Sequence, residues 1–161
     1  MTAGDSRVAY FLSLDWVVDD DEARTEENFR QLLAEVESPR ELHGMVAVFN
    51  WDCGAEDLRP ILMHPKCDVA TVLLAYWRAC PGYFCQYTSE EDIPKGGERD
   101  QWEFLKFAHA LLDQRLSVPS AVHFDPKNDP TAGGYDWTSD YKHERSQHGF
   151  YSIPETFKQA V

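Results

Sequence analysis

Apolar residues recur at helical spacing in several short segments of this 161-residue chain, and these segments are separated by proline, glycine or other turn-forming residues. In residues 29–36 and 42–49 the apolar positions fall at i, i+3, i+4 and i+7, the pattern of an amphipathic helix. Helices this short are stable only when their apolar faces pack against other elements. The pattern therefore predicts a mainly α fold, a compact array of about five or six helices.

Capping residues mark where these helices begin. The stretch 38–41, Ser-Pro-Arg-Glu, is a capping box with proline in the first turn. Thr25, Asp57 and Asp68 stand before other apolar segments, where their side-chain oxygens are expected to accept from backbone N–H groups. The Pro81-Gly82 pair is expected to stop the helix that begins after Asp68.

The second half of the chain combines one long helix with irregular structure. Residues 88–99 contain Pro94 and paired glycines and are predicted to form a surface loop. A helix is predicted from Asp100 to Leu116, where apolar residues recur over several turns. Beyond Pro119 the sequence is rich in proline, glycine and aromatic residues, which is typical of an ordered but irregular segment wrapped over a core.

The domain organisation follows from length and composition. A chain of 161 residues with 43% hydrophobic residues carries enough apolar surface for one core. We expect a single domain over residues 1–161, with a helical core at about 25–116 and a C-terminal wrap at about 117–161.

Residues 8–18 fit both strand alternation and a helical stripe, and we favour a helix, followed by a solvated acidic connection at 19–22.

The charge balance restricts the partners. With 28 acidic and 15 basic side chains, the formal net charge is −13. This charge repels phosphate backbones and anionic lipid heads, so we expect no nucleic-acid or membrane partner, whereas a basic protein fits. Solubility alone accounts for the charge equally well. The sequence has no membrane-length apolar run and no secretion signal, so we expect a cytoplasmic location.

Residue types that could carry chemistry occur without a familiar catalytic pattern. The chain has no phosphate-binding glycine loop, no nucleophile elbow and no His-Glu-x-x-His pair. His64 and Cys67 have the spacing of two metal ligands, and a complete site would need more cysteines from among Cys53, Cys80 and Cys85. Structural zinc sites normally carry two short pairs, so we predict no metal, no cofactor and no catalytic residue. The cysteines are expected to be free thiols in a reducing cytosol.

A hydrolase is the alternative from another class. Cys67 is the cysteine best placed for activation at a helix start, although the carboxylate of Asp68 beside it works against a thiolate. The C-terminal segment also gathers side chains that could form an acid–base pair or bind a divalent ion. These are His123, His143, His148, Asp125, Asp129, Asp136, Asp140 and Glu144. Their spacing does not recur, so a solvated polar surface is the simpler interpretation.

Aromatic and acidic residues are the candidates for binding a partner. Trp77 and Trp102 lie on predicted apolar faces and are assigned to the core, whereas aromatic residues in the Gly- and Asp-rich segment are better placed at an interface. Carboxylates on loops would face a basic partner. The candidate partner-binding residues are Asp19, Asp20, Asp21, Glu22, Glu90, Glu91, Asp92, Tyr135, Asp136, Trp137 and Tyr141.

Two turns in the first half of the chain carry a family resemblance. After the stretch 38–43 come an Asn-Trp-Asp-Cys-Gly turn at 50–54 and a His-Pro-Lys-Cys-Asp turn at 64–68. Over roughly residues 29–90 the sequence resembles the bacterial domain-of-unknown-function family numbered 4274, with Cys53 where that family has a second Asp. The motif residues are expected to be architectural, because helix ends need such caps and corners. They are Asn50, Trp51, Asp52, His64, Pro65, Cys67 and Asp68.

The resemblance implies a small cytosolic bacterial protein, and it links some family members to the immunity genes that accompany secreted toxins. The size, acidity and lack of a catalytic motif in this chain fit such a role. The leading hypothesis is a non-catalytic immunity protein that neutralises a basic bacterial toxin in interbacterial competition by occluding its active site. A small metal-dependent or cysteine hydrolase and a structural or adaptor protein are the alternatives.

Overall fold

A computed structural model describes residues 25–51, 54–139 and 149–161 of the chain. Several predictions lie outside these residues. They are the segment 8–18, the acidic run Asp19, Asp20, Asp21 and Glu22, the motif residues Asp52 and Cys53, and Asp140, Tyr141, His143, Glu144 and His148 of the tail. The predicted cap formed by the Thr25 side chain also lies outside the described structure.

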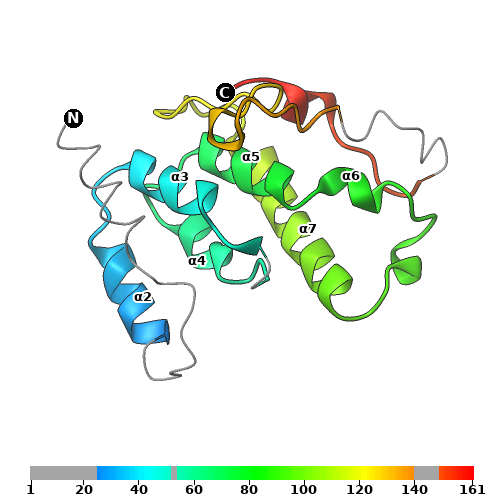
Figure 1. The fold of residues 1–161 in the computed structure, drawn as a ribbon, viewed down its shortest axis with the longest axis horizontal. Coiled ribbons are helices and arrows are strands. Elements are labelled where there is room, and N and C mark those ends of the chain that lie inside the picture. Colours follow the sequence, from blue (N-terminus) through cyan, green and yellow to red (C-terminus); the bar gives the residue numbers. More distant parts are fainter. Residues whose placement is uncertain (1–24, 52–53, 140–148) are drawn as a thin grey trace.

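The described part of the chain contains six α-helices and no strand (Figure 1). The α-helices are α2 (Thr25–Ala34), α3 (Pro39–Ala47), α4 (Leu58–Met63), α5 (Val69–Arg78), α6 (Pro81–Phe84) and α7 (Gly97–Arg115). Three short 3-10 helices accompany them: η2 (Glu90–Asp92), η3 (Pro130–Ala132) and η4 (Glu155–Lys158). The prediction of a mainly α fold is confirmed, as are the helices predicted from the periodicity of residues 29–36 and 42–49.

The capping box before α3 is confirmed. Ser38 is extended and stands at the N-cap, with Pro39 at the first helical position. The carboxylate of Glu41 accepts from the backbone N–H of Glu37 at 2.7 Å and from that of Ser38 at 3.4 Å. Because Glu41 is buried, these bonds offset part of the cost of removing its charge from water.

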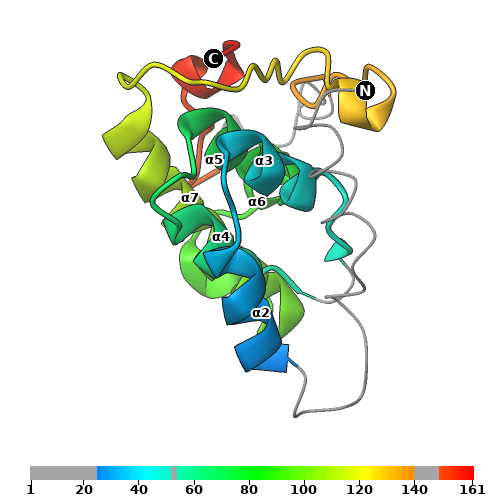
Figure 2. The same cartoon turned by 90° about the vertical axis from the view of Figure 1, so that its left-hand side faces the viewer.

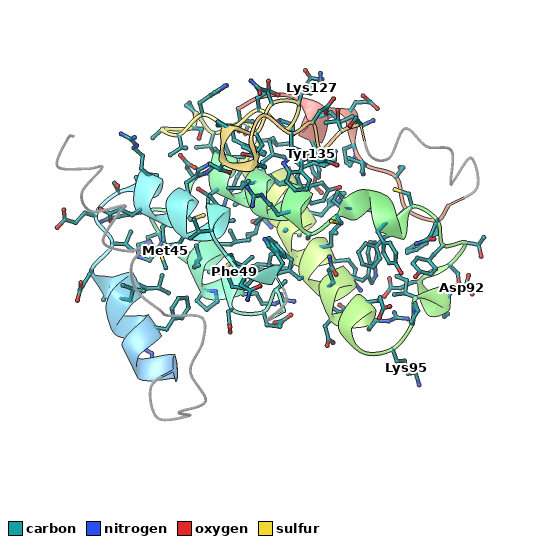
Figure 3. The ribbon with its side chains drawn as sticks, in the orientation of Figure 1. Met45, Phe49, Asp92, Lys95, Lys127 and Tyr135 are labelled. Carbon is teal, nitrogen blue, oxygen red and sulfur yellow. The ribbon has the colours of Figure 1, made fainter. Side chains whose placement is uncertain are left out.

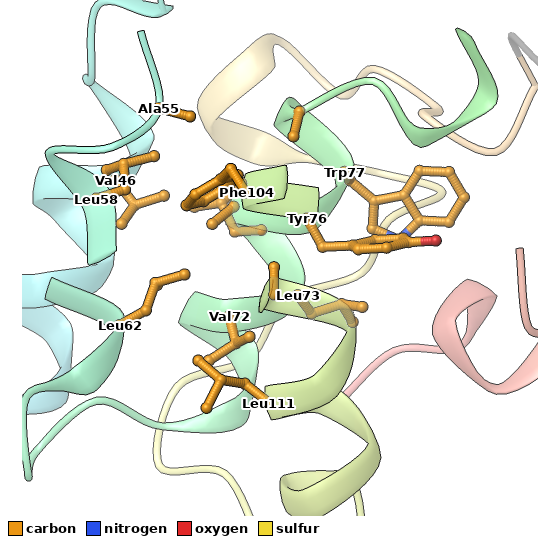
Figure 4. Packing of buried hydrophobic residues seen from close by; sticks show 14 of the residues in the cluster. Val46, Ala55, Leu58, Leu62, Val72, Leu73, Tyr76, Trp77, Phe104 and Leu111 are labelled. Carbon is orange, nitrogen blue, oxygen red and sulfur yellow. The ribbon is translucent and has the colours of Figure 1, made fainter. Parts of the chain in front are cut away.

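The core surrounds α5, whose residues 69–77 are all buried. Helix α5 packs against α3 on one side and against α7 on the other, and α4 lies next to both α3 and α5. Figure 4 shows Val72 and Leu73 of α5 among side chains of the neighbouring helices, such as Leu62 of α4 and Leu111 of α7. Trp77 and Trp102 both belong to this core, as predicted.

The C-terminal segment runs along one side of the helical array, over α3 and α5 (Figures 1 and 2). Its ends meet where Phe124 and Val161 exchange backbone hydrogen bonds at 3.1 and 3.0 Å. The indole N–H of Trp77 donates to the carbonyl of Phe157 at 2.8 Å, which ties α5 to this segment. The irregular, aromatic-rich wrap predicted beyond residue 116 is confirmed over its described residues, 117–139 and 149–161.

Three local predictions need correction. Pro81-Gly82 does not end α5, because the chain already turns at Cys80, which has φ 52°, and Pro81 then begins α6. The loop after residue 88 ends at Gly96, whose φ of 97° suits glycine, so α7 begins three residues before Asp100. Asp57 occupies the N-cap of α4, but its own backbone is helical and its side chain makes no cap hydrogen bond.

Neighbouring residues of α4 provide a matched test of this core. Leu62 is fully buried, whereas Met63 is 57% exposed. We expect Leu62→Ala to lower the free energy of unfolding by about 2–5 kcal/mol, because it leaves a cavity, and Met63→Ala to change it by less than about 0.5 kcal/mol. Urea unfolding followed by circular dichroism measures both. Equal losses would contradict the assignment of Leu62 to the core.

Candidate functional site

The family-motif residue Asp68 joins two distant parts of the chain. Its Oδ1 accepts from the backbone N–H and the hydroxyl of Thr71, both at 3.4 Å, and so caps α5. Its Oδ2 accepts from the hydroxyl of Ser120 at 2.9 Å and from the N–H groups of Ala121 and Val122 at 3.0 Å each. Asp68 therefore holds the wrap against the start of α5.

His43 lies beside this cluster. Its Nδ1 is 3.3 Å from the Thr71 hydroxyl, and its ring packs against Phe124 with centroids 6.1 Å apart. Burial lowers the pKa of His43 from 6.5 to about 4, although the carboxylates of Asp68 and Asp129 act in the opposite direction. The imidazole is therefore neutral at pH 7.

The other residues of the His-Pro-Lys-Cys-Asp turn also make structural contacts. His64 Nδ1 accepts from the backbone N–H of Lys66 at 3.1 Å. Cys67 is buried, and burial raises the pKa of its thiol to about 12, although the nearby Arg115 favours the thiolate. A thiol with this pKa is protonated at neutral pH and is a poor nucleophile.

The earlier turn of the motif is only partly described. Asn50 is exposed, and Trp51 packs edge-on against Phe49 at 5.5 Å and Phe104 at 6.1 Å between ring centroids. These contacts place the Trp51 ring on the core between α3 and α7. Cys67, Cys80 and Cys85 are free thiols, and within the described ranges no group of three or more His, Cys, Asp or Glu residues is arranged to hold a metal ion.

A second polar cluster joins the wrap to the end of α5. Asp129 is buried and its Oδ2 accepts from Arg78 at 3.1 Å and from the Trp137 indole N–H at 3.0 Å. Its Oδ1 accepts from the backbone N–H and hydroxyl of Thr131. Burial raises the pKa of Asp129, but the hydrogen bonds from Thr131, Trp137 and Arg78 outweigh it and keep the pKa below the usual value.

The predicted interface residues of the tail therefore differ in how much of their surface is exposed. The ring of Trp137 also lies 5.4 Å from the Arg78 guanidinium, and the Asp136 carboxylate accepts from the backbone and hydroxyl of Thr138. Both residues are half-buried and hold the loop in place. Tyr135 packs edge-on against Trp137 and is 39% exposed, so it is the one described tail candidate that presents much surface.

The remaining described histidine and carboxylate of the tail are separate from this cluster. His123 Nδ1 lies 2.9 Å from the carbonyl of Val161, and Asp125 accepts from the backbone N–H of Lys127. The first contact joins the two ends of the wrap and the second closes a local turn, and neither pairs His123 with Asp125 or Asp129.

A chain of polar contacts that the sequence did not predict crosses from α7 to the wrap. The hydroxyls of Tyr76 and Tyr151 are 2.5 Å apart, and His109 Nδ1 is 3.1 Å from the Tyr151 hydroxyl. His109 Nε2 lies 3.5 Å from the Asp113 carboxylate. The His109 ring also packs edge-on against Phe157 at 4.8 Å. The arrangement satisfies the buried Tyr76 side chain and fixes the wrap to α7.

The predicted acidic loop holds Glu90, Glu91 and Asp92 in η2. Glu90 lies 2.9 Å from the ammonium of Lys106 and 3.4 Å from the guanidinium of Arg99, and the Lys106 hydrogen bond lowers the pKa of Glu90. Asp92 accepts from Thr88 and Ser89, which lowers its pKa as well. Glu91 is exposed.

Three aromatic rings that the sequence reasoning missed lie close to this loop. Tyr83 is 45% exposed and Phe150 is 37% exposed, and Tyr87 is half-buried beside them. The Tyr87 hydroxyl donates to the Tyr83 hydroxyl at 3.1 Å, and the Phe150 N–H donates to the Tyr87 carbonyl at 3.0 Å. We call Tyr83, Tyr87 and Phe150, together with Glu90, Glu91 and Asp92, the aromatic–acidic patch.

The patch rests on a rigid base. Buried Phe84 and Trp102 lie beneath it, with their ring centroids 5.3 Å apart, and Trp102 packs edge-on against Phe150 at 5.2 Å. The four-residue spacing of Tyr83 and Tyr87 was a usable signal that their rings meet, because α6 and the turn that follows it bring the two side chains together. Phe150 gave no such signal, because only the wrap brings it to this place.

The patch and the tail candidates form separate surfaces. In Figure 3, Asp92 lies beyond α6 near the beginning of α7, whereas Tyr135 lies on the wrap above α5. The sequence-predicted surfaces therefore do not combine into one interface within the described structure.

The fold and these contacts define a small helical protein whose polar motif residues hold the chain together. Residues 37–110 match the model of the family described as Domain of unknown function (DUF4274), so the resemblance predicted for roughly residues 29–90 is confirmed. No curated protein and no solved structure matches the chain. Among the helices that the structure describes, none is long and apolar enough to cross a membrane.

Replacing the Asp68 carboxylate tests its role as a clamp. We expect Asp68→Ala to lower the free energy of unfolding by roughly 2–4 kcal/mol, because it removes a helix cap and the acceptor for two backbone N–H groups. Asp57→Ala is the matched control, since Asp57 stands at an N-cap without a side-chain bond. Chemical unfolding measures both, and an equally small effect for the two variants would contradict the clamp.

The lowered pKa of His43 predicts acid sensitivity. The unfolded chain binds a proton at this residue below pH 6.5, whereas the folded chain does so only below about pH 4. The free energy of unfolding therefore decreases as pH falls from 6.5 to about 4. We expect it to decrease less over this range in the His43→Gln variant, which lacks the titrating imidazole. Unfolding free energies measured at several pH values give the comparison. Parallel profiles for the two proteins would show that His43 does not contribute.

Proposed function

We propose that this protein is a non-catalytic binding protein of the immunity type, which neutralises a basic bacterial toxin by occluding its active site. The toxin would be a nuclease or another enzyme that acts on an anionic substrate, since such enzymes present cationic grooves. The protein would act in the cytoplasm, where an immunity protein protects the cell that produces the toxin.

The proposal rests on a difference between the buried polar residues, which make structural contacts, and the residues that remain at the surface. Cys67 and Asp129, which were candidates for chemistry, are buried, and Asp129 attaches the wrap to α5. Asp68 caps α5 and holds the other part of the wrap. Exposed aromatic rings and loop carboxylates remain at the surface. Exposed aromatic side chains are common energetic anchors of protein interfaces.

The net charge supports the same function. A charge of −13 would accelerate encounter with a basic toxin by electrostatic steering. The same charge would weaken binding to nucleic acid, so the protein would compete for the toxin's groove without binding the toxin's substrate. Binding would then be faster at low ionic strength.

Co-expression with the product of the gene immediately upstream tests the proposal. We expect this chain to restore growth to cells that express that product, and the two proteins to co-purify as a stoichiometric complex. Cells carrying the empty vector are the control for rescue. Association measured by stopped flow should slow as salt increases, because steering is screened. If the chain neither restores growth nor forms a complex with that product, the immunity function is rejected.

A further inference from the structure

We propose that the aromatic–acidic patch is the docking surface for the partner, and that it receives an arginine-rich surface of that basic protein. This inference rests on the proposed function, because it identifies the surface that would bind the toxin. It is carried by the position of exposed aromatic rings next to loop carboxylates at one end of the molecule.

The aromatic part of the patch is built as an anchor. Tyr83 and Phe150 expose their rings, while Phe84 and Trp102 support them from the buried side. The hydroxyl contact between Tyr87 and Tyr83 further restricts these side chains. Rings that are already held in place lose little conformational entropy on binding.

The carboxylates define the chemistry of the partner. Residues 88–100 carry five acidic and two basic side chains. Glu90 is already paired with Lys106 and Arg99, whereas Glu91 is exposed. Glu98 lies close enough to act electrostatically on Tyr87. A planar guanidinium can stack on a tyrosine or phenylalanine ring while it pairs with a carboxylate, which an ammonium does less well.

The other exposed aromatic corner is less suited to such a partner. There the Trp137 ring already lies against the guanidinium of Arg78, and its indole N–H is bonded to Asp129. The Asp129 carboxylate is itself paired with Arg78. At this place Trp137 and Asp129 already contact Arg78 of the same chain. These are the kinds of contact that the patch would make with an arginine of the partner.

Fluorescence anisotropy of a labelled deca-arginine peptide, with the full chain at about 0.1–0.15 M salt, tests the patch without the toxin. We expect the arginine peptide to bind more tightly than deca-lysine. The double variant Tyr83→Ala, Phe150→Ala should weaken arginine binding roughly tenfold, because two ring contacts are lost. Tyr135→Ala is the matched control, since Tyr135 has a similar exposed fraction and lies on the wrap, and it should change affinity by less than about twofold.

A second variant distinguishes a loss of binding from a loss of folding. Glu91→Lys leaves every ring in place and should also weaken binding of the arginine peptide, because it reverses the exposed charge beside them. Circular dichroism confirms that each variant is folded. The inference is overturned if wild type does not bind the peptide, if arginine and lysine peptides bind equally, or if Tyr135→Ala weakens binding as much as the double variant.

The growth-rescue experiment separates this inference from the proposed function. If wild type rescues growth and the folded patch variants rescue equally well, the immunity function stands and the surface is wrong. If the peptide results are as expected but no upstream product is neutralised, the patch is a binding surface and the immunity function fails.

Discussion

The structure depends on burying a helix that is apolar on nearly every side. All of residues 69–77 of α5 are buried, so α5 needs neighbours around its whole circumference. α3 and α7 cover two sides, and the wrap covers much of the remainder (Figures 1 and 2). The bond from the Trp77 indole to Phe157 stabilises this arrangement, because a buried donor without a partner would cost about 1–3 kcal/mol. The irregular C-terminal segment is thus part of the core.

The same constraint explains where the polar motif residues go. A wrap with little regular secondary structure leaves backbone N–H groups that need acceptors, and the Asp68 Oδ2 accepts from two of these N–H groups. Asp129 serves the loop around Thr131 and Trp137 in the same way, with Arg78 balancing its charge. Both carboxylates therefore make several hydrogen bonds that connect α5 to the wrap.

The aromatic–acidic patch, which we propose as the docking surface, is assembled from two parts of the chain. Most of the aromatic–acidic patch comes from residues 83–92, inside the segment 37–110 that matches the family. Phe150 comes from the wrap and is fixed there by its bond to Tyr87 and its packing on Trp102. The family-matched segment supplies the acidic edge, and the wrap completes the aromatic surface.

The sequence by itself determined most of the helices, the capping roles of Ser38 and Asp68, and the core positions of Trp77 and Trp102, because helical periodicity and capping are local properties that three or four neighbouring residues express. It also located the exposed loop with Glu90 and Glu91. Only the tertiary structure decided that Phe150 meets Tyr87, that Tyr151 meets Tyr76 and His109, and that Trp137 contacts Arg78. These pairs are separated by long stretches of irregular chain, whose path is set by packing against α5 and not by any local pattern.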